Sequence, residues 1–236
     1  MPIPRLTFFT TIAFIGIAAI LIGFSKTFII PFLSGTKSWP WMIYLHAAFA
    51  FCWVLLFLCQ SWLVKIKKQQ LHFVIGRFGI FIALGTAVTI LPASMYQCER
   101  ELREGLGHIA ISSILGSLIS AIIFFAFVCL AIAYRTKPQS HKRFMLLATI
   151  ILLWPAWFRW RHYFPSVQEP HIWFAIVLAD ALIFVSFAWD WIKNKRIHPA
   201  LLFGGIFIVA EQCIELMLFD SSGWRLIATN IYNFVK

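Results

Sequence analysis

Four histidines in this chain stand where helices could hold a metal or a haem. His46, His72, His108 and His141 lie near the ends of successive apolar runs of helix length, at alternating ends of those runs. Neutral imidazoles are common ligands of haem iron, and two of them on facing helices can hold the flat macrocycle between them. The alternation therefore predicts b-type haem bound by histidine pairs at two depths.

Small and basic residues near these histidines fit the same interpretation. Ser112 and Gly116 follow His108 at spacings of four residues, which places all three on one stripe of a helix and leaves room for a macrocycle. Guanidinium groups bind carboxylates through paired hydrogen bonds, so Arg77 and Arg159 are expected to hold the haem propionates.

A second group of side chains competes for two of the same histidines. Glu211 and Glu215 lie one turn apart on one face of the last apolar run. A carboxylate buried in a membrane needs a proton, a cation or an arginine to balance it. Zinc, copper or iron could supply the cation, in a non-haem site with the ligands His46, His108, His162, His171, Glu211 and Glu215.

Two further interpretations need no metal. The same carboxylates, together with Asp180, could carry protons to a quinone or to a transported ion, as in a proton-coupled transporter. Alternatively, the two glutamates could form structural ion pairs with Arg159 and Arg161. The histidines would then be ordinary interfacial residues, and the small residues would only allow close helix packing.

The class of protein follows from the composition. Of 236 residues, 61% are hydrophobic and 12% are charged, and the mean hydropathy is +0.84. This leaves too little polar surface for a soluble globule of this size. The net charge of +11 comes from basic residues in short links between apolar runs, without a nucleic-acid motif. We expect one integral membrane domain, 1–236, in contact with lipid and not with nucleic acid.

Seven apolar runs are long enough to cross a membrane as helices. They predict an all-α, polytopic transmembrane bundle whose second to fifth spans form a four-helix core that carries the four histidines. Pro155 interrupts the fifth run, because proline disturbs a helix interior. The expected spans are 6–30, 41–64, 72–95, 107–134, 143–160, 171–192 and 198–219.

Lysine and arginine predict the orientation of these spans. They are more frequent in the links at one end, which include Lys65, Lys67 and Lys68, than at the other, where acidic residues dilute them. Positively charged links favour the cytoplasmic side. We therefore expect a multi-pass protein of a bacterial inner (cytoplasmic) membrane with its amino terminus inside.

The order of the histidines resembles the core of the cytochrome b561 family, which carries electrons across membranes through two haems. This resemblance implies that His46 pairs with His108 at the outer side and His72 with His141 at the inner side. The stretches LHFVIGRFG and SHKRFMLLAT are also similar to a family of bacterial inner-membrane proteins of unknown function, which has HRxLG and HRRLM motifs at such places.

These observations together predict a membrane-embedded electron-transfer protein with haem b as cofactor. It would exchange electrons with quinol, a metal ion or a redox partner protein, and a transmembrane oxidoreductase is one form that this activity could take. The zinc, copper or iron site and the proton-coupled transporter stay open as alternatives.

Overall fold

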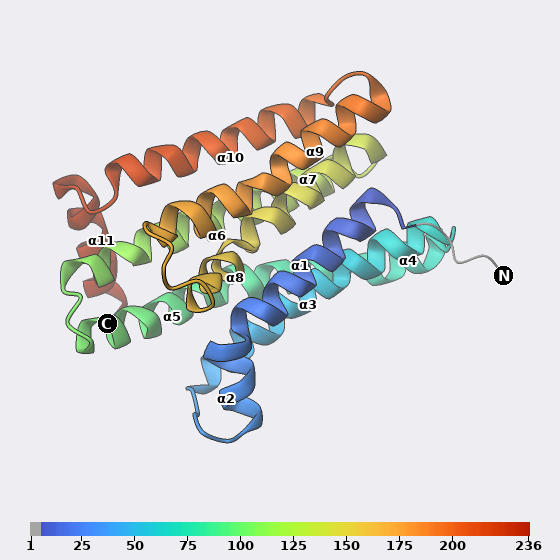
Figure 1. Cartoon of the computed structure of the whole chain (residues 1–236). Helices are drawn as coiled ribbons and strands as arrows, with labels where there is room; N and C mark the ends of the chain where they lie inside the picture. Colours follow the sequence, from blue (N-terminus) through green and yellow to red (C-terminus); the bar gives the residue numbers. More distant parts are fainter. Residues whose placement is uncertain (1–5) are drawn as a thin grey trace.

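The computed structural model describes residues 6–236, and in this range the regular secondary structure is entirely helical (Figure 1). Six helical stretches are long and apolar enough to cross a membrane. The chain is therefore a polytopic helical membrane protein, and the predicted fold class is confirmed. The six stretches are Phe8–Leu33, Trp41–Lys65, Gln69–Arg103, His108–Ala133, His171–Asn194 and Pro199–Leu218.

Three of these stretches are single α-helices and three are composite. The single helices are α3 (Trp41–Lys65), α6 (His108–Ala133) and α10 (Pro199–Leu218). The first composite stretch contains α1 (Phe8–Phe24), η1 (Ser25–Ile29) and α2 (Ile30–Leu33). The second contains α4 (Gln69–Gly76) and α5 (Gly79–Arg103). The third contains η3 (His171–Leu178) and α9 (Ala179–Asn194). Both η1 and η3 are π-helical, a geometry that is rare and occurs frequently at functional sites.

The apolar run 143–160 is interrupted, as its proline predicts. It forms α7 (Pro138–Leu152) and α8 (Trp154–Phe158), followed by the 3-10 turn η2 (Arg159–His162). Helix α7 ends shortly before Pro155 because proline has no N–H to donate to the preceding turn. Pro155 instead stands in the first turn of α8, where that N–H is not needed. This run therefore crosses the bundle in two short pieces and not as one helix.

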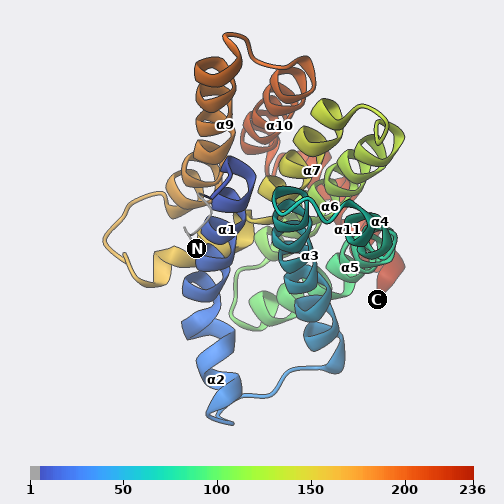
Figure 2. The same ribbon diagram turned by 90° about the vertical axis from the view of Figure 1, so that its right-hand side faces the viewer.

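Helices α3, α5, α6 and α7 pack in a closed group, α3 on α5, α5 on α6, α6 on α7 and α7 back on α3. Trp53 of α3 lies at its centre, where its Nε1 donates to Thr149 Oγ1 of α7 at 3.2 Å and its ring meets Phe124 of α6 edge-on. This group is the predicted four-helix core. Figure 2 shows α1 beside α3, and α9 and α10 next to each other beside α7; α1 also meets α9, where the Phe8 ring stacks on that of Trp189.

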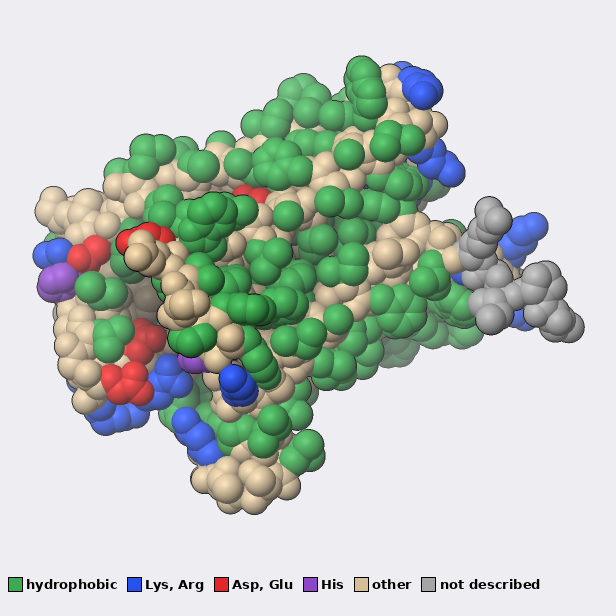
Figure 3. All heavy atoms as spheres, in the orientation of Figure 1, with side chains coloured by type: hydrophobic (Ala, Val, Ile, Leu, Met, Phe, Trp, Pro, Cys, Tyr) green, Lys and Arg blue, Asp and Glu red, His purple; other side chains and the backbone are tan. Residues whose placement is uncertain are grey.

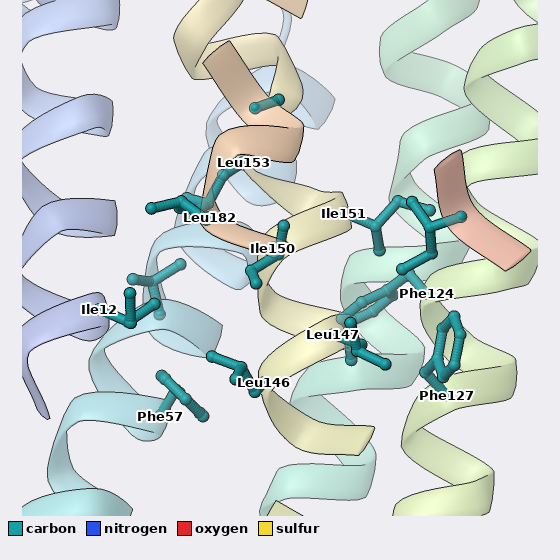
Figure 4. Packing of buried hydrophobic residues seen from close by; sticks show 14 of the residues in the cluster. Ile12, Phe57, Phe124, Phe127, Leu146, Leu147, Ile150, Ile151, Leu153 and Leu182 are labelled. Atoms are coloured by element: carbon teal, nitrogen blue, oxygen red, sulfur yellow. The ribbon is translucent and has the colours of Figure 1, made fainter. Parts of the chain in front are cut away.

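Helix α7 is the most enclosed element of the bundle. Its Leu146 and Ile150 point toward Ile12 of α1 and Phe57 of α3, whereas Leu147 and Ile151 point toward the phenylalanines of α6 (Figure 4). Each of these four aliphatic side chains is almost completely buried. Burial of an aliphatic side chain of this size stabilises a fold by roughly 1.5–3 kcal/mol in water, and in lipid the same close packing supplies the dispersion contacts that hold helices together.

The surface of the bundle is apolar between two charged ends (Figure 3). Large apolar side chains such as Phe81 (69% exposed), Ile192 (71%) and Phe203 (69%) face outward from the spans. This pattern matches a lipid environment. We call the two ends the α4 end and the α11 end, after the short helices that lie there (Figure 1).

A buried ion pair joins α7, α9 and α10 at the α4 end. Arg143 (2% exposed side chain) donates through Nε to Asp190 Oδ2 at 3.0 Å and through Nη2 to Oδ1. Asp190 also accepts from Asn194 Nδ2 and from the backbone N–H of His198, each at 2.8 Å. Arg143 Nη1 donates to the backbone and side-chain oxygens of Gln139. With its polar atoms paired in this way, Arg143 serves as a structural anchor.

The last helix, α11 (Ser222–Val235), lies across the end of the bundle. Ser221 caps it by accepting a hydrogen bond from the backbone of Trp224. Trp224, Ala228 and Tyr232 are buried at spacings of four residues and pack toward α6. Trp224 Nε1 donates to the carbonyl oxygen of Ser112 at 2.9 Å. This hydrogen bond holds α11 against the part of α6 that carries Ser112.

Candidate functional site

Two carboxylates lie on α10, and one of them, Glu215, faces the small-residue stripe of α6. Glu211 and Glu215 are one turn apart and both are partly buried. A Cβ atom at Gly116 of α6 would overlap Glu215 Oε1, so the carboxylate of Glu215 occupies the space that the missing side chain leaves. The glycine of the predicted stripe therefore makes room for a carboxylate from the neighbouring helix.

A third carboxylate, Asp180, comes from α9. It is 4% exposed, and neither of its oxygens has a hydrogen-bond partner. Gln212 of α10 is its polar neighbour, but the Gln212 Oε1 atom is also buried without a partner. Asp180 is the second residue after the π-helical segment η3. Figure 3 shows acidic surface between α9 and α10, away from both charged ends.

Glu211 lies between the charges of the other two carboxylates, and none of the three has a basic partner within residues 6–236. Glu211 lies within Coulomb range of both Glu215 and Asp180. None of the three belongs to an ion pair among residues 6–236. We refer to Asp180, Glu211 and Glu215 as the carboxylate cluster.

The two arginines that could have neutralised this cluster are occupied elsewhere. Arg159 donates to the carbonyl oxygen of Pro155 at 2.8 Å and stacks over the Phe24 ring at 4.2 Å. Arg161 donates to the carbonyl oxygen of Phe158 at 3.1 Å and lies over that residue's ring. The described residues therefore do not form the ion pairs between the two glutamates and Arg159 and Arg161 that were one interpretation of the sequence.

The cluster is better suited to protons than to a metal ion. Within the described range, 6–236, no three His, Cys, Asp or Glu side chains are arranged so that they could hold a metal. Two neighbouring carboxylates without a cation cannot both stay ionised at low cost in an apolar medium. Uptake of a proton is one way to remove that cost.

A hydrogen-bonded group of side chains, formed by His108, Ser112, Asp220 and Arg225, lies at the α11 end. His108 Nδ1 lies 3.1 Å from Asp220 Oδ1, and the hydroxyl of Ser112 donates to the same oxygen at 2.8 Å. Arg225 binds both oxygens of Asp220, at 2.8 and 2.5 Å. These hydrogen bonds, above all those from Arg225, lower the pKa of Asp220 to about 2. Asp220 is therefore a fixed negative charge beside His108.

The predicted outer haem ligands have separate hydrogen-bond partners. His46 Nδ1 lies 3.0 Å from Thr89 Oγ1, whose own hydrogen is donated to the carbonyl oxygen of Gly85. The His46 ring must then donate through Nδ1 to the threonine, just as His108 must donate through Nδ1 to the carboxylate of Asp220. In the neutral form of each ring, the free electron pair is therefore on Nε2.

The predicted inner ligands differ from each other. His141 Nδ1 donates to the carbonyl oxygen of Ala131 at 2.7 Å, which again leaves the electron pair on Nε2. The Gln60 side chain faces His72; with its amide nitrogen turned toward the ring, it would donate to His72 Nδ1, and its oxygen would accept from the backbone of Gly76 at 3.2 Å. His72 and His141 lie within Coulomb range of each other.

The remaining predicted site residues lie apart from the carboxylate cluster. Arg77 is exposed at the junction of α4 and α5. The backbone oxygen of His162 accepts from Lys26 Nζ at 3.0 Å, and His171 Nε2 lies 3.4 Å from Glu169 Oε2 at the exposed start of η3. The six-ligand metal set is thus distributed over several local contacts, and the structure brings together only its two glutamates.

Two important residues were missed by the sequence reasoning. Asp220 is among the acidic residues that dilute the basic links and was given no role, although it joins α6 to α11, and Asp190 was not considered, although it holds Arg143. Asp190 could have been noticed as a single acid between tryptophans in an apolar run, since such a charge requires a buried partner.

No family model, curated protein or solved structure matches this chain. The geometry of its own residues is therefore what indicates its function.

Proposed function

We propose that this chain is a proton-coupled membrane transporter in which the carboxylate cluster binds and releases the protons. The observation that carries the proposal is Asp180, a carboxylate inside a predicted span that is buried, has the Gln212 side chain as its polar neighbour and forms no ion pair within residues 6–236. An ionised group in that position costs several kcal/mol. A proton removes the charge, and a group that changes protonation in this way can drive a conformational change.

The surroundings of the cluster support this role. Glu211 is partly buried and lies close enough to the other two acids for the charge of one to affect the next. The cluster comes from α9 and α10, which pack on α7 at the side of the four-helix core. A change of charge in the cluster would therefore act on the packing between these peripheral helices and the core.

Proteoliposomes that enclose a pH-sensitive dye test this proposal. Amino acids, sugars and small inorganic cations are added outside in turn, and we expect one class to move protons together with solute. Asp180→Asn is expected to abolish the proton movement, whereas Glu104→Gln, at an exposed position of the same charge type, leaves it unchanged. Proton movement that persists in Asp180→Asn would contradict the proposal.

A second candidate, b-type haem electron transfer, is favoured by the orientation of three imidazoles. Metal-binding histidines usually donate one ring N–H to an oxygen and bind the metal through the other nitrogen. His46, His108 and His141 have this arrangement. Nε2 of His46 or His108 would be the iron ligand toward the α11 end and Nε2 of His141 the ligand toward the α4 end, and the haem would supply one-electron chemistry.

An absorption spectrum of the purified protein separates the two candidates. Haem would give a Soret band and an α-band that sharpens on reduction, and both would be lost in His46→Ala. A colourless, metal-free protein would remove the haem candidate and would leave the proton site as it stands.

A further inference from the structure

An open groove runs between the beginnings of α7 and α10 at the α4 end. It has a volume of about 380 Å³, and it is open toward the surroundings of the bundle on one side. Helix α7 begins at Pro138 and α10 at Pro199, so the amino ends of both helices meet at the groove. The residues that line it are Tyr134, Lys137, Ser140, Phe144, His198, Pro199, Ala200, Phe203 and Gly204.

One part of the groove is polar and basic. Lys137 is exposed, lies over the ring of Tyr134 at 5.5 Å, and belongs to none of the ion pairs within residues 6–236. His198 accepts a hydrogen bond from Ala200 N through Nδ1, so its Nε2 carries the hydrogen of the neutral ring. Ser140 adds a hydroxyl. The amino ends of the two helices add positive partial charge at the same place.

The other part is apolar. Phe144 lies two turns into α7, and Phe203 lies one turn into α10, where 69% of its surface is exposed. The position therefore combines donors at the level of the helix ends with apolar surface at the level of the spans. A ligand with an anionic head and a hydrocarbon chain matches both parts.

We propose that this groove binds an anionic phospholipid, with the phosphate at Lys137, Ser140 and His198 and an acyl chain along Phe144 and Phe203. A soluble anion would use only the basic part and would leave Phe203 exposed. Other basic residues stand at the same end of the bundle and raise the local concentration of anionic lipid. They are Arg135, Lys142, Lys193, Lys195 and Arg196.

The neutral state of His198 agrees with this assignment. Burial, and after it the nearby charge of Arg143, lowers the pKa of His198. Asp190 acts in the opposite direction, while Arg196 and Lys142 also disfavour the charged ring. At neutral pH the ring therefore offers one N–H to the phosphate, and Lys137 supplies the positive charge.

Thermal unfolding of the full chain in a neutral detergent tests the proposal. Phosphatidylglycerol is expected to raise the unfolding temperature in a saturable manner, whereas phosphatidylcholine and inorganic phosphate are expected not to do so. In Lys137→Gln the apparent affinity for phosphatidylglycerol should fall roughly fivefold, which is the effect of one basic residue at an anionic membrane surface. Phe203→Ser should weaken binding without affecting the preference for the anionic head group.

Lys37→Gln is the matched control, because Lys37 also lies over an aromatic ring, that of Trp39 at 5.5 Å, but does not line the groove. It should bind phosphatidylglycerol like the unmodified chain. Equal affinity in Lys137→Gln, equal stabilisation by phosphatidylcholine, or equal stabilisation by inorganic phosphate would each overturn the proposal. Size-exclusion chromatography of each variant before lipid addition shows whether it is folded.

Discussion

The Glu215 side chain of α10 rests on the bare backbone of Gly116 in α6, in the space where any larger residue at position 116 would place its Cβ. This contact lies one turn below Ser112, which joins α6 to Asp220. The stripe His108, Ser112 and Gly116 was read from the sequence as room for a macrocycle. In the structure, Gly116 of this stripe meets Glu215 near the end of α10, and Ser112 binds Asp220 in the turn that follows α10.

Gly116→Ala is expected to displace the Glu215 carboxylate and to leave the helix intact. Alanine favours a helix interior over glycine by about 1 kcal/mol, and the atom in its way is the mobile end of a side chain. Infrared spectroscopy of the carboxylic acid groups should therefore differ from that of the unmodified chain. Gly223→Ala, where a Cβ meets nothing within 4 Å, should leave the spectrum unchanged. Identical spectra for both variants would contradict the contact.

Asp190→Ala is expected to lower the free energy of unfolding by about 3–5 kcal/mol, because it leaves the buried Arg143 charge without its partner. Replacing both residues, in Arg143→Met with Asp190→Leu, should restore much of the loss. The control is Glu104→Ala, which breaks an exposed pair with Arg100 worth less than about 1 kcal/mol. Unfolding in detergent measures all three. A loss for Asp190→Ala as small as that of the control would argue against the network.

Gly23→Ala is expected to destabilise the contact between α1 and α8. A Cβ at position 23 would overlap the carbonyl oxygen of Ala156, which is backbone and cannot turn aside. Forcing extra volume into a well-packed contact costs about 1–3 kcal/mol. Gly76→Ala is the matched control, because its Cβ would meet the Gln60 side chain at an ordinary 3.6 Å. Equal melting temperatures for the two variants would show that α1 does not pack so closely.

The stability of the α11 end should depend on acid pH through Asp220. Its pKa falls from 3.8 to about 2 in the folded chain, chiefly because Arg225 donates to it. Its contribution is therefore fully present above pH 3.8 and is lost as the pH falls toward 2. Thermal unfolding at pH 5 and pH 3 should show a larger loss for the unmodified chain than for Asp220→Asn. Equal losses would mean that Asp220 is not held in this way.

The bundle could be predicted from the sequence because hydrophobic length and Pro155 determine it locally. Membrane-length apolar runs predict helices wherever they occur, and Pro155 interrupts the fifth run, although Pro92 lies inside α5 without ending it. The side-chain partners could not be predicted in the same way. Whether Gly116 faces a ring or a carboxylate depends on the rotation of α10 about its own axis, which the pattern of α6 alone does not define.

The final helix illustrates the same limit. Ser221 and the spacing of Trp224, Ala228 and Tyr232 mark a capped, amphipathic helix, and this pattern was readable after the last apolar run. Its partner was not, because Trp224 reaches the carbonyl oxygen of Ser112, more than one hundred residues earlier in the chain.

Infrared titration of the carboxylic acids tests the central claim most directly. In the unmodified chain at neutral pH, we expect absorption from protonated carboxyl groups that disappears as the pH is raised. Asp180→Asn should reduce this absorption, and Glu104→Gln should not. A spectrum without protonated carboxyl groups at neutral pH, or one that Asp180→Asn leaves unchanged, would contradict the assignment of Asp180, Glu211 and Glu215 as the proton site.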